Sequence, residues 1–169
     1  MIPKENNFAY IDGANLHKGI QELGWQLDYR KFRTFLREKY GVSRAYIFLG
    51  FVPANANLYR DLQNWGYVVV FKPTLPDGVG DVKGNCDAEL VLQAVSDTYE
   101  LLYDSAVVVT GDGDFACLVK FLKEKMKFRV VLSPNYKKAS VLLRRTAPDN
   151  MVFLDRLKNR LKYEKNSQK

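Results

Sequence analysis

The sequence has little of the chemistry that many enzyme classes need. Its 169 residues include only two cysteines and one histidine. Cys86 and Cys117 are too few for a disulfide framework. His17 leaves too few soft ligands for zinc, and a Ser-His-Asp triad has no support from one poorly placed histidine. The glycine patterns of a P-loop and of a dinucleotide-binding fold are also missing, which counts against a nucleotide cradle.

Long hydrophobic runs are lacking as well. No apolar stretch approaches the length of a membrane span, and residues 1–7 do not have the pattern of a signal peptide. The cysteines lack CxxC spacing, which suits a reducing compartment. We therefore expect a cytoplasmic protein that does not bind membranes. The length fits one domain with a single sizeable core.

Charge is present but unevenly placed. The net charge is +7, and residues 137–169 contain ten basic and three acidic residues, so this segment carries the whole excess. Such a segment is the electrostatic footprint expected for a polyanionic partner. A solvated surface that only aids solubility explains the charge equally well, and charge alone leaves both interpretations open.

Apolar runs with strand character alternate with segments of helical spacing along the chain. This alternation predicts an α/β fold with a mainly parallel sheet and right-handed crossovers, in strand order 3-2-1-4-5 with a sixth short strand as an option. We expect the domain to cover residues 1–155, followed by a basic C-terminal helix and tail over 156–169. The strands are expected at 8–11, 45–52, 67–71, 106–109, 127–132 and 151–154, the helices at 16–23, 29–40, 54–65, 86–102, 115–126, 139–145 and from 155 onward, and a binding loop at 72–84.

Four aspartates stand where strands end or helices begin. Asp12 follows the first strand, Asp112 and Asp114 follow the fourth, and Asp87 opens the long helix before it. In the expected strand order the first and fourth strands are neighbours at the switch point, where open α/β sheets bind ligands. The four carboxylates would then converge despite their distance in sequence. Clustered carboxylates repel one another unless a cation lies between them.

Each of these residues also has an ordinary structural explanation. Asp87 and Asp114 could cap helices or sit in a first turn, and Asp12 and Asp112 could belong to Asp-Gly turns. Asn15, three residues after Asp12, could orient a carboxylate, a water or a phosphate, or it could be a helix N-cap. An EF-hand is excluded, because the fifth and twelfth positions counted from Asp112 are an alanine and a lysine.

Oxygen ligands of this kind favour Mg²⁺ or Mn²⁺. A magnesium site with few carboxylates completes its coordination with water and substrate phosphate, which suits phosphoryl chemistry. We therefore take Asp12, Asp87, Asp112 and Asp114 as candidate metal ligands.

Three motifs carry a resemblance to a known family. Residues 10–16, the pair Lys83-Gly84 followed by Asp87, and residues 110–115 resemble the NYN domain family of PIN-like nucleases, in its bacterial LabA-like group. The likeness covers residues 8 to about 155. It implies a PIN-like three-layer α/β/α sandwich and metal-dependent cleavage of RNA. It also implies that the family's acidic residues correspond to Asp12, Asp87, Asp112 and Asp114, and its polar residue of the first motif to Asn15.

The sequence departs from the family pattern at two places. Thr110 stands where serine is common, which keeps the hydroxyl group. Asn85 and Cys86 precede Asp87 where a small apolar pair is more usual, which affects how the helix start places Asp87.

The leading hypothesis is a Mg²⁺- or Mn²⁺-dependent endoribonuclease with Asp12, Asn15, Asp87, Asp112 and Asp114 as catalytic residues. The alternative is a non-catalytic RNA-binding or regulatory PIN-like module; a phosphatase for small esters would not need so extended a basic surface. The partner is expected to be single-stranded or structured RNA, while DNA and a homodimer stay open. Tyr136 and Phe71 are candidates for base stacking. Candidate phosphate contacts are Lys83, Lys137, Lys138, Arg144 and Arg145.

Overall fold

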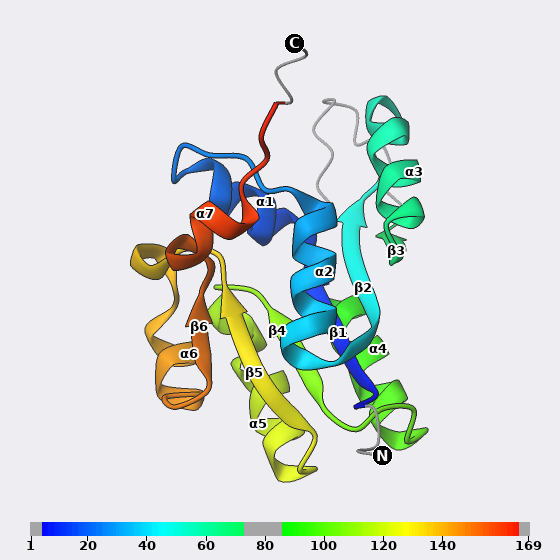
Figure 1. The fold of residues 1–169 in the computed structure, drawn as a ribbon. Coiled ribbons are helices and arrows are strands. Elements are labelled where there is room, and N and C mark those ends of the chain that lie inside the picture. The colour runs from blue at the N-terminus through cyan, green and yellow to red at the C-terminus, as the bar shows by residue number, and fades with distance from the viewer. Residues whose placement is uncertain (1–4, 73–85, 166–169) are drawn as a thin grey trace, which may run out of the picture.

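A computed structural model of the protein describes residues 5–72 and 86–165. Within these ranges, six parallel strands form one sheet in the order β3-β2-β1-β4-β5-β6 (Figure 1). The predicted α/β class and strand order are confirmed, and the short sixth strand extends the sheet beyond β5. The strands are β1 (Asn7–Asp12), β2 (Val42–Gly50), β3 (Tyr67–Lys72), β4 (Ala106–Val109), β5 (Phe128–Ser133) and β6 (Met151–Phe153).

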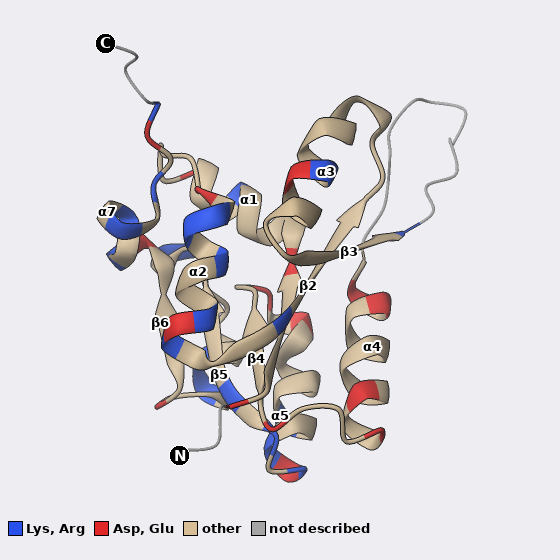
Figure 2. Cartoon of the chain, turned by 45° about the vertical axis from the view of Figure 1, so that its right-hand side comes forward, with Lys and Arg blue, Asp and Glu red and all other residues tan. Residues whose placement is uncertain are grey.

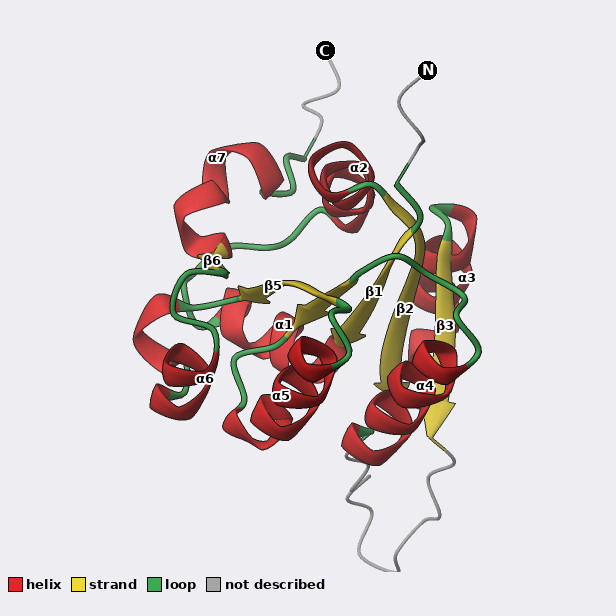
Figure 3. Ribbon diagram, turned by 90° about the horizontal axis from the view of Figure 1, so that it is seen from below, coloured by secondary structure: helices red, strands yellow, loops and turns green. Residues whose placement is uncertain are grey.

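Helices cover both faces of the sheet and make the expected three-layer sandwich. Figure 3 shows α2 and α7 on one side of the sheet and α4, α5 and α6 on the other. No helix among the described residues is long and apolar enough to cross a membrane. The helices are α1 (Gly13–Gln21), α2 (Tyr29–Tyr40), α3 (Ala56–Asn64), α4 (Asp87–Tyr99), α5 (Ala116–Glu124), α6 (Val141–Thr146) and α7 (Lys158–Leu161), with 3₁₀ turns η1 (Pro53–Asn55), η2 (Gly113–Phe115), η3 (Tyr136–Lys138) and η4 (Leu154–Leu157).

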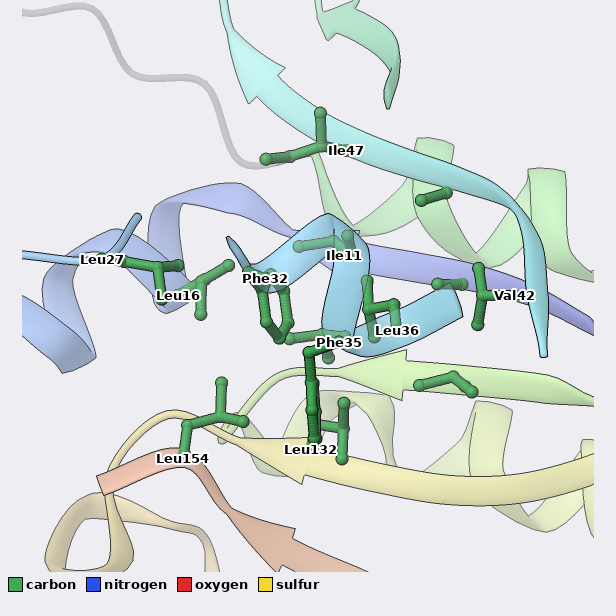
Figure 4. Close-up of a cluster of buried hydrophobic side chains, with 14 of the residues drawn as sticks. Ile11, Leu16, Leu27, Phe32, Phe35, Leu36, Val42, Ile47, Leu132 and Leu154 are labelled. Carbon is green, nitrogen blue, oxygen red and sulfur yellow. The ribbon is translucent and has the colours of Figure 1, made fainter. Parts of the chain in front are cut away.

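Two hydrophobic cores result from the alternation of side chains along the central strands. Ile11 of β1 points into the core beneath α2, while Tyr10 points into the core beneath α4 and α5. Phe32 and Leu36 of α2 fill the first core (Figure 4). Both faces of a parallel sheet are buried in this way, which is why its strands read as nearly continuous apolar runs.

Local signals set the helix ends much as the sequence predicts. The side chain of Asp28 caps α2 by accepting a hydrogen bond from the N–H of Lys31 at 3.0 Å. Gly41 then ends the helix in the left-handed conformation, with φ of 59°. Other ends differ from expectation: α4 stops at Tyr99 rather than 102, and Leu101 takes a positive φ of 55°.

The segment after Asp155 differs most from its prediction. Instead of one basic helix, the chain forms η4 and the four-residue α7, then leaves the helix to make a bridge between Lys162 and Leu27. Leu161 explains the short helix, because it is fully buried in the core beneath α2. The expected binding loop, apart from Lys72, lies outside the described residues, and the division of the chain at residue 155 stays a prediction.

Candidate metal centre

The site lies at the carboxyl edge of the sheet, where β1 and β4 are neighbours. Ile11 pairs with Val109 in parallel register, so Asp12 and Thr110 follow their strands at the same edge. The buried hydroxyl of Thr110 donates a hydrogen bond to Asp12 Oδ2 at 3.2 Å and accepts one from the N–H of Asp112 at 3.1 Å. Thr110 therefore connects two acidic stretches that are far apart in the sequence.

Three aspartates form a cluster at this edge. Asp87, Asp112 and Asp114 each place one carboxylate oxygen within 4.8 Å of the others. Asp87 is the first residue of α4, and Asp112 and Asp114 belong to the turn that leads from β4 into α5. Asp87 and Asp112 are half-buried, while Asp114 is exposed. Three carboxylates this close together repel one another, and a bound cation would offset that repulsion.

Asp12 lies beside this cluster without belonging to the group of three. It shares a cavity of about 250 Å³ with Asn15, Lys18, Asp87 and Asp112. Burial raises the pKa of the Asp12 carboxyl above its ordinary value, and the negative charges of Asp87 and Asp112 raise it further. The hydrogen bonds from the Asn15 N–H and the Thr110 hydroxyl act in the opposite direction. A cation in this cavity would stabilise the charged form of Asp12.

Two of the four aspartates cap a helix or turn in addition to their place in the site. Asp12 is the N-cap of α1, because its Oδ1 accepts a hydrogen bond from the Asn15 N–H at 3.1 Å. Asn15 is therefore not the N-cap. Asp112 caps the η2 turn through the N–H of Asp114 at 3.0 Å, whereas Asp114 caps no helix. Asp87 sits in the first turn of α4, behind the N-cap Cys86.

Asn15 connects α1 to the turn after β4. Its Oδ1 accepts a hydrogen bond of 2.7 Å from the N–H of Gly111. Lys18 lies one helical turn further on and lines the acidic cavity as well as a neighbouring cleft. Sequence reasoning missed Lys18, although its position three residues after Asn15 on α1 places both on one helix face.

Of the residues predicted to contact phosphate, three have exposed side chains and one is engaged with an aromatic ring. Lys137 and Lys138 are exposed on η3, and Arg145 is exposed on α6. The guanidinium of Arg144 instead lies 4.3 Å from the centre of the Tyr136 ring and donates to the Tyr136 carbonyl. Lys83 lies outside the described residues. Figure 2 shows that the acidic start of α4 lies well away from the basic α7.

The two aromatic residues considered for base stacking already have ring partners. Tyr136 makes an edge contact with Phe153 at 4.8 Å, between the guanidinium groups of Arg144 and Arg156. Phe71 packs edge-on against Tyr59 at 4.7 Å. Tyr136 is still exposed, while Phe71 is half-buried in an aromatic cluster at the end of β3.

The side chains of the cavity fit a hard divalent cation. The ligand atoms on offer are carboxylate oxygens, which suit Mg²⁺ and Mn²⁺. Cys86 also lines the cavity, but burial raises the pKa of its thiol and so favours the neutral form. One cysteine among carboxylates, with no histidine lining the cavity, is not the nitrogen and sulfur donor set that zinc prefers, so the residues favour magnesium or manganese.

The α/β fold and the aspartate cluster are those expected for an NYN domain, and comparison with known proteins supports this family. The NYN domain family matches residues 8–155, and the chain belongs to that family. The low amplitude and bright protein LabA of Synechococcus elongatus is 28% identical over 160 residues, which cover 89% of this chain and 84% of LabA. A crystal structure from Vibrio parahaemolyticus, of a protein of unknown function, has the same fold: its TM-score is 0.80 at 23% identity, over 96% of this chain and 99% of that one.

Proposed function

We propose that the protein is a metal-dependent endoribonuclease that hydrolyses phosphodiester bonds of RNA. One observation carries the proposal: Asp87, Asp112 and Asp114 place oxygens within 4.8 Å of one another at the switch point of the sheet. Membership of the NYN family and the basic segment after residue 136 support a polynucleotide substrate.

Each residue of the site has a role in this proposal. Asp87, Asp112 and Asp114 would hold Mg²⁺ or Mn²⁺, with Asp12 facing the same space. When bound, the cation supplies water activation and stabilises negative charge on the phosphoryl group. Thr110 keeps Asp12 oriented through its hydroxyl group.

Two further residues would position the substrate. Asn15 fixes the Gly111 turn, so that Asp112 stays at the entrance to the cavity. Lys18 places a positive charge beside the acids, where a substrate phosphate would lie.

The test is cleavage of labelled single- and double-stranded RNA and DNA with Mn²⁺, Mg²⁺ or EDTA. We expect RNA fragments with either cation and none with EDTA. Asp87→Asn and Asp112→Asn should lower the rate at least 100-fold, because each removes a carboxylate charge that holds the metal. Glu100→Gln is the matched control, since it removes an exposed charge from the other end of α4. Unchanged cleavage by both aspartate variants would refute the assignment.

The non-catalytic RNA-binding module remains the second candidate. The observation in its favour is that Asp12 and Asp112 cap α1 and η2, so the fold needs them without any catalysis. This function predicts RNA binding in Mn²⁺ with no cleavage at any enzyme concentration.

A further inference from the structure

A second cleft adjoins the acidic cavity on the other side of Lys18. It has a volume of about 200 Å³ and lies between α1 and the ends of β4 and β5. Asn15 and Lys18 line both spaces, so the cleft and the acidic cavity are neighbours. Lys138 contributes a second positive charge, and Glu22 a single negative one.

The wall of this cleft contains a buried hydroxyl group without a partner. Ser133 is fully buried, and its Oγ makes no hydrogen bond to any residue in the described ranges. Such orphaned hydroxyls are uncommon in folded proteins, because losing water without a replacement costs about 1–3 kcal/mol. An oxygen acceptor that enters the cleft would remove this cost.

Gly111 lies against that hydroxyl and adds no side chain between Ser133 and Asn15. A Cβ atom at this position would lie 3.1 Å from Ser133 Oγ and 3.5 Å from Asn15 Oδ1. Any larger residue would therefore fill the space between the two polar groups. The Asn15 Nδ2 also donates no hydrogen bond to a described residue, whereas the Oδ1 of the same side chain accepts from the Gly111 N–H. The cleft thus offers a hydroxyl and an amide donor beside two lysines.

We infer that this cleft binds a phosphate of the polynucleotide strand next to the one at the acidic cluster. A phosphate oxygen accepts hydrogen bonds from hydroxyl and amide groups, and its charge is matched by Lys18 and Lys138. Because the two spaces share Asn15 and Lys18, adjacent phosphates of one strand can reach both. The inference rests on the proposed function for the identity of the strand, but the phosphate site itself can be tested separately.

The first experiment titrates inorganic phosphate into the ¹⁵N-labelled protein in EDTA at low salt, followed by amide NMR shifts. Without metal, the acidic cluster repels phosphate, so shifts at Gly111 and Asn135 report the cleft. We expect Ser133→Ala and Lys138→Ala each to weaken binding about tenfold, in keeping with the loss of a charge-assisted hydrogen bond or an ion contact. Lys120→Ala is the matched control, because this exposed lysine of α5 does not line the cleft. Glu22→Gln should tighten binding.

Folding of the Ser133→Ala variant serves as an internal check. Removal of an unpartnered hydroxyl should leave the melting temperature unchanged or raise it. No phosphate-induced shift in the parent protein, or equal losses in Lys120→Ala and Lys138→Ala, would overturn the site.

The second experiment repeats the comparison with a labelled single-stranded RNA by fluorescence anisotropy, again in EDTA. Ser133→Ala and Lys138→Ala should weaken RNA binding while Lys120→Ala has less effect. If the phosphate result holds but RNA neither binds nor is cleaved in Mn²⁺, the cleft stands as an anion site and the nuclease proposal fails. If RNA is cleaved but the cleft variants bind phosphate and RNA normally, the nuclease stands and this inference fails.

Discussion

In the described part of the chain, buried polar groups are fully hydrogen-bonded at the amino end of the sheet, whereas at its carboxyl end some lack partners or carry unfavourable charge. At the amino end, Asn7 is 2% exposed and fully engaged: its Nδ2 donates to the Tyr40 carbonyl at 2.7 Å and its Oδ1 accepts from the Ser105 N–H at 3.0 Å. At the carboxyl end, Ser133 Oγ is orphaned among the described residues, and burial raises the pKa of Asp12. The first arrangement stabilises the fold, and the second holds unfavourable interactions that a ligand can relieve.

This contrast predicts that substitutions at the two ends of the sheet have opposite effects on stability and on ligand binding. Removing a polar side chain at the amino end should destabilise the protein and leave its ligand binding intact. Removing a charge at the carboxyl end should cost little stability and abolish ligand binding.

The largest effect is expected for Asn7→Ala. The substitution leaves the Tyr40 carbonyl and the Ser105 N–H buried without partners, which should cost about 3 kcal/mol. The melting temperature should fall by about 10 °C for a chain of this size. The control is Asn64→Ala at the exposed end of α3. Equal melting temperatures for the two variants would remove the basis of the contrast.

The second-largest expected effect is the stabilisation of the folded protein by Mn²⁺ bound at the carboxyl end of the sheet. Mn²⁺ at 100 times its dissociation constant should stabilise the parent protein by about 2.7 kcal/mol. Asp112→Asn should lose most of this gain. In EDTA the variant should be at least as stable as the parent, because asparagine keeps the oxygen that accepts from the Asp114 N–H and loses only the repelling charge.

Thermal melts in Mn²⁺ and in EDTA measure both quantities. A parent protein whose melting curve does not respond to Mn²⁺, together with a destabilised Asp112→Asn, would mean that the aspartates are ordinary capping residues.

Substitution of the two adjacent arginines of α6 should have smaller effects, one on stability and the other on RNA binding. Arg144→Ala should cost about 1 kcal/mol, because its guanidinium lies over the rings of Tyr136 and Phe153. Arg145→Ala should leave stability unchanged, since this side chain is exposed. It should instead lower the salt dependence of RNA binding, with about 0.7 lost from the log–log slope. A reversed pattern, measured by melts and salt titrations, would exchange the roles of the two residues.

The smallest effect is the pH dependence attributed to Asp12. Its folded-state pKa is raised, so the folded protein binds the proton more tightly than the unfolded chain does. The metal-free protein therefore carries a penalty at neutral pH, and this penalty is relieved as the pH falls through the raised pKa. In EDTA, Asp12→Asn should gain stability over the parent at pH 7, and the gain should shrink toward pH 4. A gain that grows on acidification would contradict the sign of the shift.

Much of the fold could be predicted from the sequence because each signal is local. The β-branched run at 106–109 and the glycines that end α2 and α3 act within a few residues. The C-terminal segment could not be predicted in this way. Its short helix depends on Leu161 reaching the core beneath α2, a contact with a distant part of the chain.

The candidate site was predictable where topology alone brings residues together. Asp12 and Asp112 follow neighbouring strands, so strand order was enough to place them at one edge. Ser133 and Lys18 were not predictable, because their importance comes from a cleft shared by α1 and β5. The stacking of Arg144 on Tyr136 likewise depends on side-chain packing that no local pattern records.

Direct titration of Mn²⁺ followed by electron paramagnetic resonance tests the central claim most closely, because it measures cation binding without any substrate. The parent protein and Glu100→Gln should remove Mn²⁺ from the free pool with the same affinity. Asp87→Asn should weaken that binding at least tenfold, since it removes the negative charge of one of the three clustered carboxylates. Equal Mn²⁺ binding by Asp87→Asn and Glu100→Gln would show that the aspartate cluster is not the metal centre.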